Sequence, residues 1–129
     1  LVLLAGATGN VINVVLQGFD HRAIGASTAV FAALGLLGAL AWAGRRASAQ
    51  GRWYRWGPVI GAVALLAFTG TGGERTDIGA HLWGFAAGLG AGLLAAVLPV
   101  QVLRRSGVQA LAGLVALGVV AGAWLLALA

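Results

Sequence analysis

The sequence predicts an all-α membrane protein: a polytopic helix bundle, with about five transmembrane helices in the 129 residues given. Composition is the first reason, because 60% of the residues are hydrophobic and only 9% are charged, whereas about a quarter of the residues in a typical soluble domain are charged. The second reason is the order of the residues. Long apolar runs alternate with short charged gaps, as expected for successive transmembrane helices.

Five apolar segments are the predicted membrane spans. A helix needs about 20 residues to cross the hydrocarbon core, and the second, fourth and fifth segments reach that length. The third is shorter and ends in glycine and threonine, and the first starts without a methionine. We therefore expect a single membrane-embedded domain over residues 1–129 that is incomplete at its N-terminus. The approximate segments are 1–17, 24–43, 57–72, 78–98 and 108–129.

The gaps between the segments alternate in charge. Gaps 44–56 and 99–107 contain six of the eight arginines and no acid, whereas gaps 18–23 and 73–77 contain all three acids. Because excess arginine marks the cytoplasmic side, segments two and four are predicted to run inward and the other three outward. We expect a multi-pass integral protein of a bacterial inner or plasma membrane. Nucleic-acid binding is not expected, because the arginines lie in short gaps between apolar segments.

Two polar residues inside the apolar segments are candidate catalytic residues. Ser27 lies about one turn inside the outer end of segment two, and His81 about one turn inside the outer end of segment four. If these segments are neighbours, an imidazole nitrogen can accept the serine proton and act as a general base. Structural roles stay open for both residues, since membrane serines commonly bond their own helix and histidines commonly bond a neighbouring one.

Nearby residues fit this arrangement. Phe31 follows Ser27 by one turn on the same helix face, where it could stack on the imidazole or simply pack. Gly25 and Gly84 would allow the two helices to approach closely, and Gly88 continues a four-residue glycine spacing typical of helix contacts in lipid. The chain has no cysteine, which excludes a thiolate nucleophile or metal ligand. We expect neither a metal nor a cofactor.

These two stretches, GAST at 25–28 and AHLWGFAAG at 80–88, resemble the motifs of the rhomboid intramembrane serine proteases. That family carries a serine in a GxSx motif and a histidine in an AHxxGxxxG motif, with an aromatic residue one turn after the serine. Segments one to four then resemble core helices three to six, and segment five an additional C-terminal helix. The matching positions are Gly25, Ser27, Phe31, His81, Gly84 and Gly88.

The resemblance implies an intramembrane serine endopeptidase that cleaves transmembrane protein substrates near the outer membrane face. Ser27 would be the nucleophile and His81 the general base and acid, in a site that faces away from the cytoplasm. The lipid bilayer is the other implied partner, and the oligomeric state is not predicted. The family works with a dyad, so Asp77, one turn before His81, is interpreted as a helix-start residue.

The sequence departs from the family pattern at two points. Thr28 stands where the family most often has glycine, and the HxxxN pattern of the family's second helix does not occur. A catalytically inactive rhomboid-like protein that binds transmembrane segments is therefore the first alternative. A small transporter or channel subunit is the second, although no acid or arginine lies in the middle of any predicted span.

Overall fold

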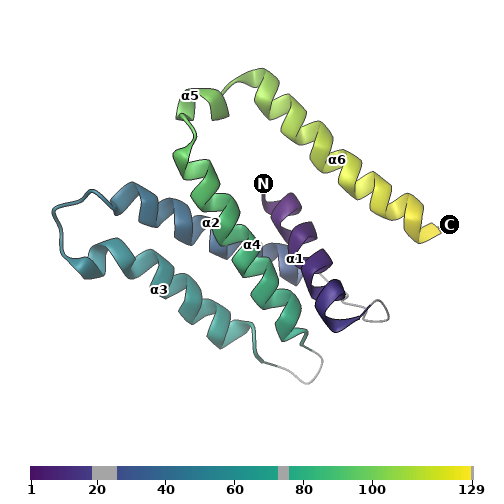
Figure 1. The fold of residues 1–129 in the computed structure, drawn as a ribbon, viewed down its shortest axis with the longest axis horizontal. Helices are drawn as coiled ribbons and strands as arrows, with labels where there is room; N and C mark the ends of the chain where they lie inside the picture. Colours follow the sequence, from purple (N-terminus) through teal and green to yellow (C-terminus); the bar gives the residue numbers. More distant parts are fainter. Residues whose placement is uncertain (19–25, 73–75, 129) are drawn as a thin grey trace.

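A computed structural model describes residues 1–18, 26–72 and 76–128 of the chain. These residues form five long helices and one short helix, and no strand is found among them (Figure 1). The all-α fold class is therefore confirmed, and each predicted segment coincides with a long helix. The helices are α1 (Val2–Gln17), α2 (Ser27–Arg45), α3 (Arg52–Thr69), α4 (Ile78–Val97), α5 (Val100–Leu103) and α6 (Ser106–Leu128).

Several helix ends differ from the predicted segments. Helix α2 begins at Ser27, so this serine is the first helical residue and not, as predicted, one turn inside the span. Helix α3 begins at Arg52 and not at residue 57, and the gap before α6 contains the short helix α5. Hydropathy marks only the apolar part of a helix. It misses helical turns formed by the charged and aromatic residues that suit a membrane interface.

Three helices are long and apolar enough to cross a membrane by length and composition, namely α2, α4 and α6. Helix α1 is a shorter apolar helix of 16 residues. Helix α3 has 18 residues, but Arg52 and Arg55 fall within that length. Within the described part of the chain, three of the five predicted spans thus meet these criteria. That α1 and α3 also span the membrane stays a prediction.

Helices α2 and α4 form the centre of the bundle and run parallel to each other. A Cβ added at Gly84 would overlap the backbone of Thr28, and one added at Gly88 would overlap the Ala32 carbonyl. Each step of one turn along α4 is therefore matched by one turn along α2. The predicted packing role of these glycines is confirmed, and so is the common direction of the two segments.

The remaining helices surround this pair unequally. Helix α1 packs against both α2 and α4, whereas α3 packs mainly on α2 and barely touches α4. Helix α6 contacts the bundle only slightly, through α1, and extends away from it in Figure 1. A Cβ at Gly118 or Gly122 of α6 would meet open space. These two glycines therefore make no close helix contact within the described residues.

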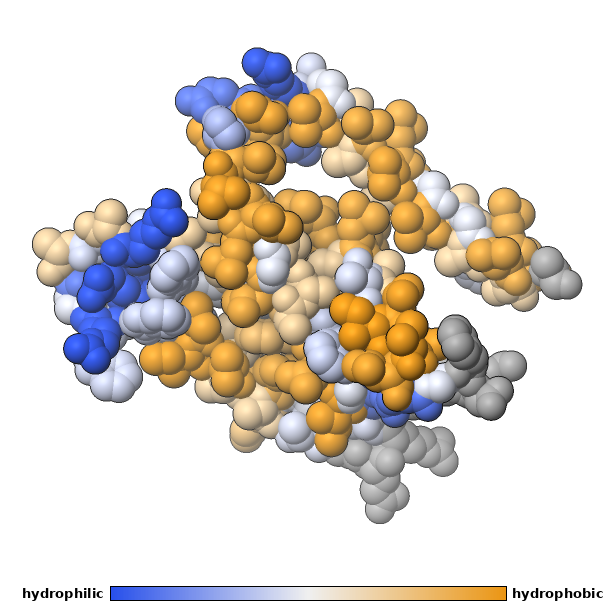
Figure 2. Space-filling model, in the orientation of Figure 1, coloured by the Kyte–Doolittle hydropathy of each residue, from blue (hydrophilic) through white to orange (hydrophobic). Residues whose placement is uncertain are grey.

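The surface of the molecule is largely apolar. Figure 2 shows hydrophobic side chains along the helices, with hydrophilic ones gathered over the ends of α2 and α3 and around α5. Large side chains such as Leu126 (82% exposed) and Phe68 (86% exposed) point outward. Soluble proteins rarely expose contiguous apolar surface on this scale, so the exterior is suited to contact with lipid.

Candidate functional site

His81 is a buried polar residue in the first turn of α4. The side chain of Asp77 begins the helix by accepting a hydrogen bond of 2.8 Å from the Ala80 N–H. This is a typical N-cap, which satisfies one of the free amides of the first turn, and it confirms the interpretation of Asp77 as a helix-start residue. His81 follows one turn later and is only 7% exposed. The cap therefore fixes the helical turn that carries the imidazole.

The imidazole of His81 has a defined backbone partner. Its Nδ1 lies 2.8 Å from the carbonyl oxygen of Gly70, just after the end of α3, and the contact is buried. A carbonyl oxygen can only accept, so Nδ1 must carry the hydrogen and donate it. In the neutral ring the other nitrogen, Nε2, then has a free lone pair. The contact thus selects the tautomer in which Nε2 can accept a proton.

Sequence reasoning did not identify Gly70 as part of the site. The structure gives it a specific role, because an added Cβ would overlap the Leu66 carbonyl oxygen and would come within 3.2 Å of the Phe31 ring. A side chain at position 70 would therefore force this turn of backbone or its neighbours to shift, next to the carbonyl that meets the imidazole. The only sequence signal was the glycine- and threonine-rich end of segment three.

Phe31 contacts His81 as predicted. The two ring centroids are 4.3 Å apart, and the ring planes are tilted by 39°. Phe31 is itself 5% exposed and belongs to the buried apolar cluster with Ala62 and Phe85. The imidazole is therefore held between an aromatic ring from α2 and a backbone carbonyl from the end of α3.

Ser27 lies at the same end of the bundle as His81. It is half-buried, it precedes Phe31 by one turn on the same face of α2, and α2 runs parallel to α4. No hydrogen bond joins Ser27 to His81 among the described residues. Thr28 faces α4, where its methyl group and carbonyl lie against Gly84, and Gly25 lies outside the described residues.

A second polar cluster, which the sequence did not predict, ties α1 to the start of α4. Asn13 is fully buried, and its Nδ2 donates to Asp77 Oδ2 at 2.9 Å. Gln17 in turn donates to Asn13 Oδ1 at 2.7 Å. These contacts hold the last turns of α1 against the N-cap that precedes His81. The described residues contain no group of histidines, cysteines and acids that could hold a metal ion.

Apolar helices packed through glycine, with a buried and oriented histidine near one end, define a polytopic membrane protein with a candidate catalytic base. The family model of the Rhomboid domain matches residues 1–98, which include all of α1 to α4. The chain therefore belongs to the rhomboid family. No curated protein and no solved structure matches it in the other two comparisons.

Proposed function

We propose that this protein is an intramembrane serine endopeptidase that cleaves transmembrane protein substrates at the end of the bundle where α2 and α4 begin. The observation that carries the proposal is the hydrogen bond from His81 Nδ1 to the Gly70 carbonyl, at 2.8 Å. It leaves Nε2 as the basic nitrogen, which is the state a general base requires. Membership of the rhomboid family supports the same reaction class.

Ser27 is the proposed nucleophile. His81 Nε2 would take the proton of the Ser27 hydroxyl while Oγ attacks the scissile carbonyl, and would then return that proton to the leaving amine. Water would hydrolyse the resulting acyl-enzyme by the same proton transfers. These steps need the hydroxyl to approach the imidazole, and catalytic hydrogen bonds often tighten when substrate binds.

The start of α2 at Ser27 also suits the developing negative charge. The first amides of a helix have no acceptor within the helix, and the N-terminal end of the helix dipole is positive. The Ser27 N–H is therefore a proposed donor to the oxyanion. A single donor of this kind is typically worth about 10²–10³ in rate.

The proposal is tested in the full-length protein with Ser27→Ala and His81→Ala. Each variant should lower cleavage of a transmembrane substrate by at least about 10³-fold, because the members of a dyad act as a unit. A fluorophosphonate probe should label wild-type protein at Ser27, and labelling should disappear in both variants. Ser48→Ala, in the loop that follows α2, is the matched control and should change neither cleavage nor labelling.

A non-cutting member of the family is the second candidate function. It is favoured by the absence of a hydrogen bond between Ser27 and His81 among the described residues, together with Thr28 beside the serine. In that case folded protein would stay unlabelled at Ser27, Ser27→Ala would change no cleavage, and a transmembrane segment would still be captured by photo-crosslinking. This outcome would overturn the protease assignment.

A further inference from the structure

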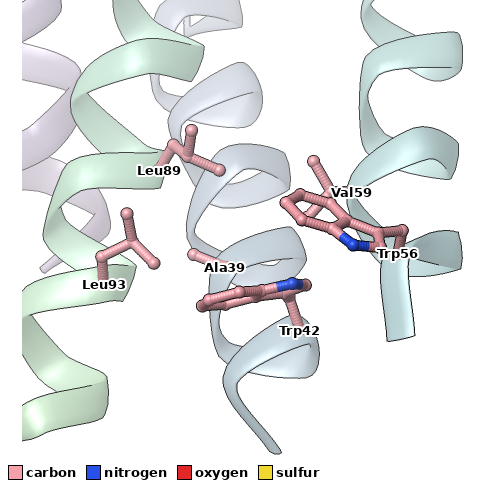
Figure 3. Close-up of a pocket in the computed structure, with 6 residues that line it drawn as sticks. All are labelled: Ala39, Trp42, Trp56, Val59, Leu89 and Leu93. Atoms are coloured by element: carbon pink, nitrogen blue, oxygen red, sulfur yellow. The ribbon is translucent and has the colours of Figure 1, made fainter. Parts of the chain in front are cut away.

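Two adjoining cavities lie at the end of the bundle opposite His81. The first has a volume of about 250 Å³ and is formed where α2 lies between α3 and α4. Figure 3 shows the lining side chains of α4 and α3 on either side of α2, with Trp42 on α2 and Trp56 on α3. All the side chains that line it are apolar, namely those of Ala39, Trp42, Trp56, Val59, Leu89 and Leu93.

The second cavity is basic and shares Trp42 and Trp56 with the first. Its volume is about 480 Å³, and its other lining residues are Arg46, Arg52 and Arg55. The Nε atom of Arg55 is buried and has no hydrogen-bond partner among the described residues. The indole rings of the two tryptophans lie 5.5 Å apart, so they form the boundary between the apolar and the basic cavity.

No carboxylate neutralises the basic cavity within the described residues. The three acids of the chain precede α2 or α4, at Asp20, Glu74 and Asp77, whereas the three arginines lie between the end of α2 and the first turn of α3. Arg45 differs from these three, because its guanidinium packs over the Tyr54 ring at 4.7 Å. The arginines of the cavity thus present hydrogen-bond donors and positive charge that no described carboxylate balances.

We propose that these two cavities form one binding site for an anionic phospholipid. The phosphate binds to Arg46, Arg52 and Arg55, since guanidinium groups match phosphate oxygens in geometry and charge. One acyl chain lies in the apolar cavity, and Trp42 and Trp56 sit at the level of the glycerol backbone, where tryptophan is favoured. A lipid explains why the basic cavity and the apolar cavity adjoin each other. A soluble anion would explain the basic cavity alone.

Native mass spectrometry of the full-length protein tests the site, with phosphatidylglycerol and phosphatidylcholine as probes. Wild-type protein should retain phosphatidylglycerol at least about tenfold more strongly than phosphatidylcholine, because basic residues near the headgroup add favourable binding energy. The triple variant R46Q/R52Q/R55Q should lose this preference. The control R104Q/R105Q removes arginines from the other basic gap and should retain it.

The role of the apolar cavity is tested separately with Leu93→Trp, which fills this cavity. The control is Leu94→Trp, which changes a residue of the same helix outside the cavity. Only Leu93→Trp should weaken phosphatidylglycerol binding, again about tenfold or more. Because both variants keep all the arginines, this pair decides the proposal even if the triple variant fails to fold.

Three results would overturn the lipid site. One is equal loss of binding in the two arginine variants, which would indicate a general effect of positive charge. Another is equal binding of phosphatidylglycerol by Leu93→Trp and Leu94→Trp. The third is competition by soluble glycerol 3-phosphate at concentrations similar to those of the lipid. This would indicate that the basic cavity binds an anion and that the apolar cavity has no role.

Discussion

Polar residues in this bundle differ in whether the fold provides them with partners. Asn13 and His81 are buried and hydrogen-bonded to groups on other helices or at their ends. Asn10, one turn before Asn13 on α1, has a buried Oδ1 with no hydrogen-bond partner in the part of the chain that the structure describes. An unmatched polar group is costly where water is scarce, so these neighbouring asparagines should contribute to stability in opposite ways.

Replacing each asparagine by alanine tests this difference. Asn13→Ala removes the hydrogen bonds to Asp77 and from Gln17, and should lower the free energy of unfolding by about 1–3 kcal/mol. Asn10→Ala removes an unpartnered atom and should be neutral or slightly stabilising. Equilibrium unfolding in mixed detergent micelles measures both. Equal losses in the two variants would contradict the role assigned to the cluster.

The main contact between elements is the parallel packing of α2 on α4, which depends on the absence of side chains at successive turns. A Cβ at Gly88 would overlap the Ala32 carbonyl, and one at Gly35 would overlap the Phe85 carbonyl. Two helix backbones can approach this closely only at glycine. The contact between Phe31 and His81 depends on the same approach, because the two rings belong to these two helices.

Two glycines of α4 provide a matched test of this packing. Gly88→Ala should lower the free energy of unfolding by about 1–3 kcal/mol, because the added methyl group forces the helices apart. Gly90→Ala, on the open side of the same helix, should be neutral or stabilise the protein by up to about 1 kcal/mol through helix propensity. Thermal unfolding of both variants would reveal the difference. A stable Gly88→Ala would show that the interface can relax.

At the scale of the whole molecule, charge is divided between the two ends of the bundle. The end of α2, the start of α3 and the turn after α5 carry arginines, while Asp77 begins α4 at the opposite end. The histidine and its partners lie at the end with Asp77. The positive-inside rule predicts that the arginine-rich end faces the cytoplasm and that the proposed site opens on the other side.

Accessibility of introduced cysteines tests this orientation, and the absence of native cysteines makes the background low. In intact cells, a cysteine at Arg46 or Arg104 should react with a membrane-impermeant maleimide only after permeabilisation. A cysteine at Gly72, close to the start of α4, should react without it. Labelling of positions 46 and 72 from one side would contradict the topology.

The sequence alone determined the helical membrane class, the positions of the five long helices and the identity of the candidate residues. Apolar run length, charge alternation and short motifs such as the one around His81 are local properties. They can be recognised without knowing which helices pack together. The approach of Phe31 to His81 was also predictable, since a one-turn spacing places Phe31 and Ser27 on one helix face.

Only the tertiary structure revealed the other polar contacts between elements. The Gly70 carbonyl orients His81 because α3 ends beside the imidazole, and a backbone carbonyl carries no sequence signature. Asn13 meets Asp77 for the same reason, at a separation of 64 residues. The start of α2 at Ser27 and of α3 at Arg52 also depends on backbone hydrogen bonding that hydropathy does not report. The sequence determines which side chains each helix carries, and the packing of the helices determines which groups those side chains contact.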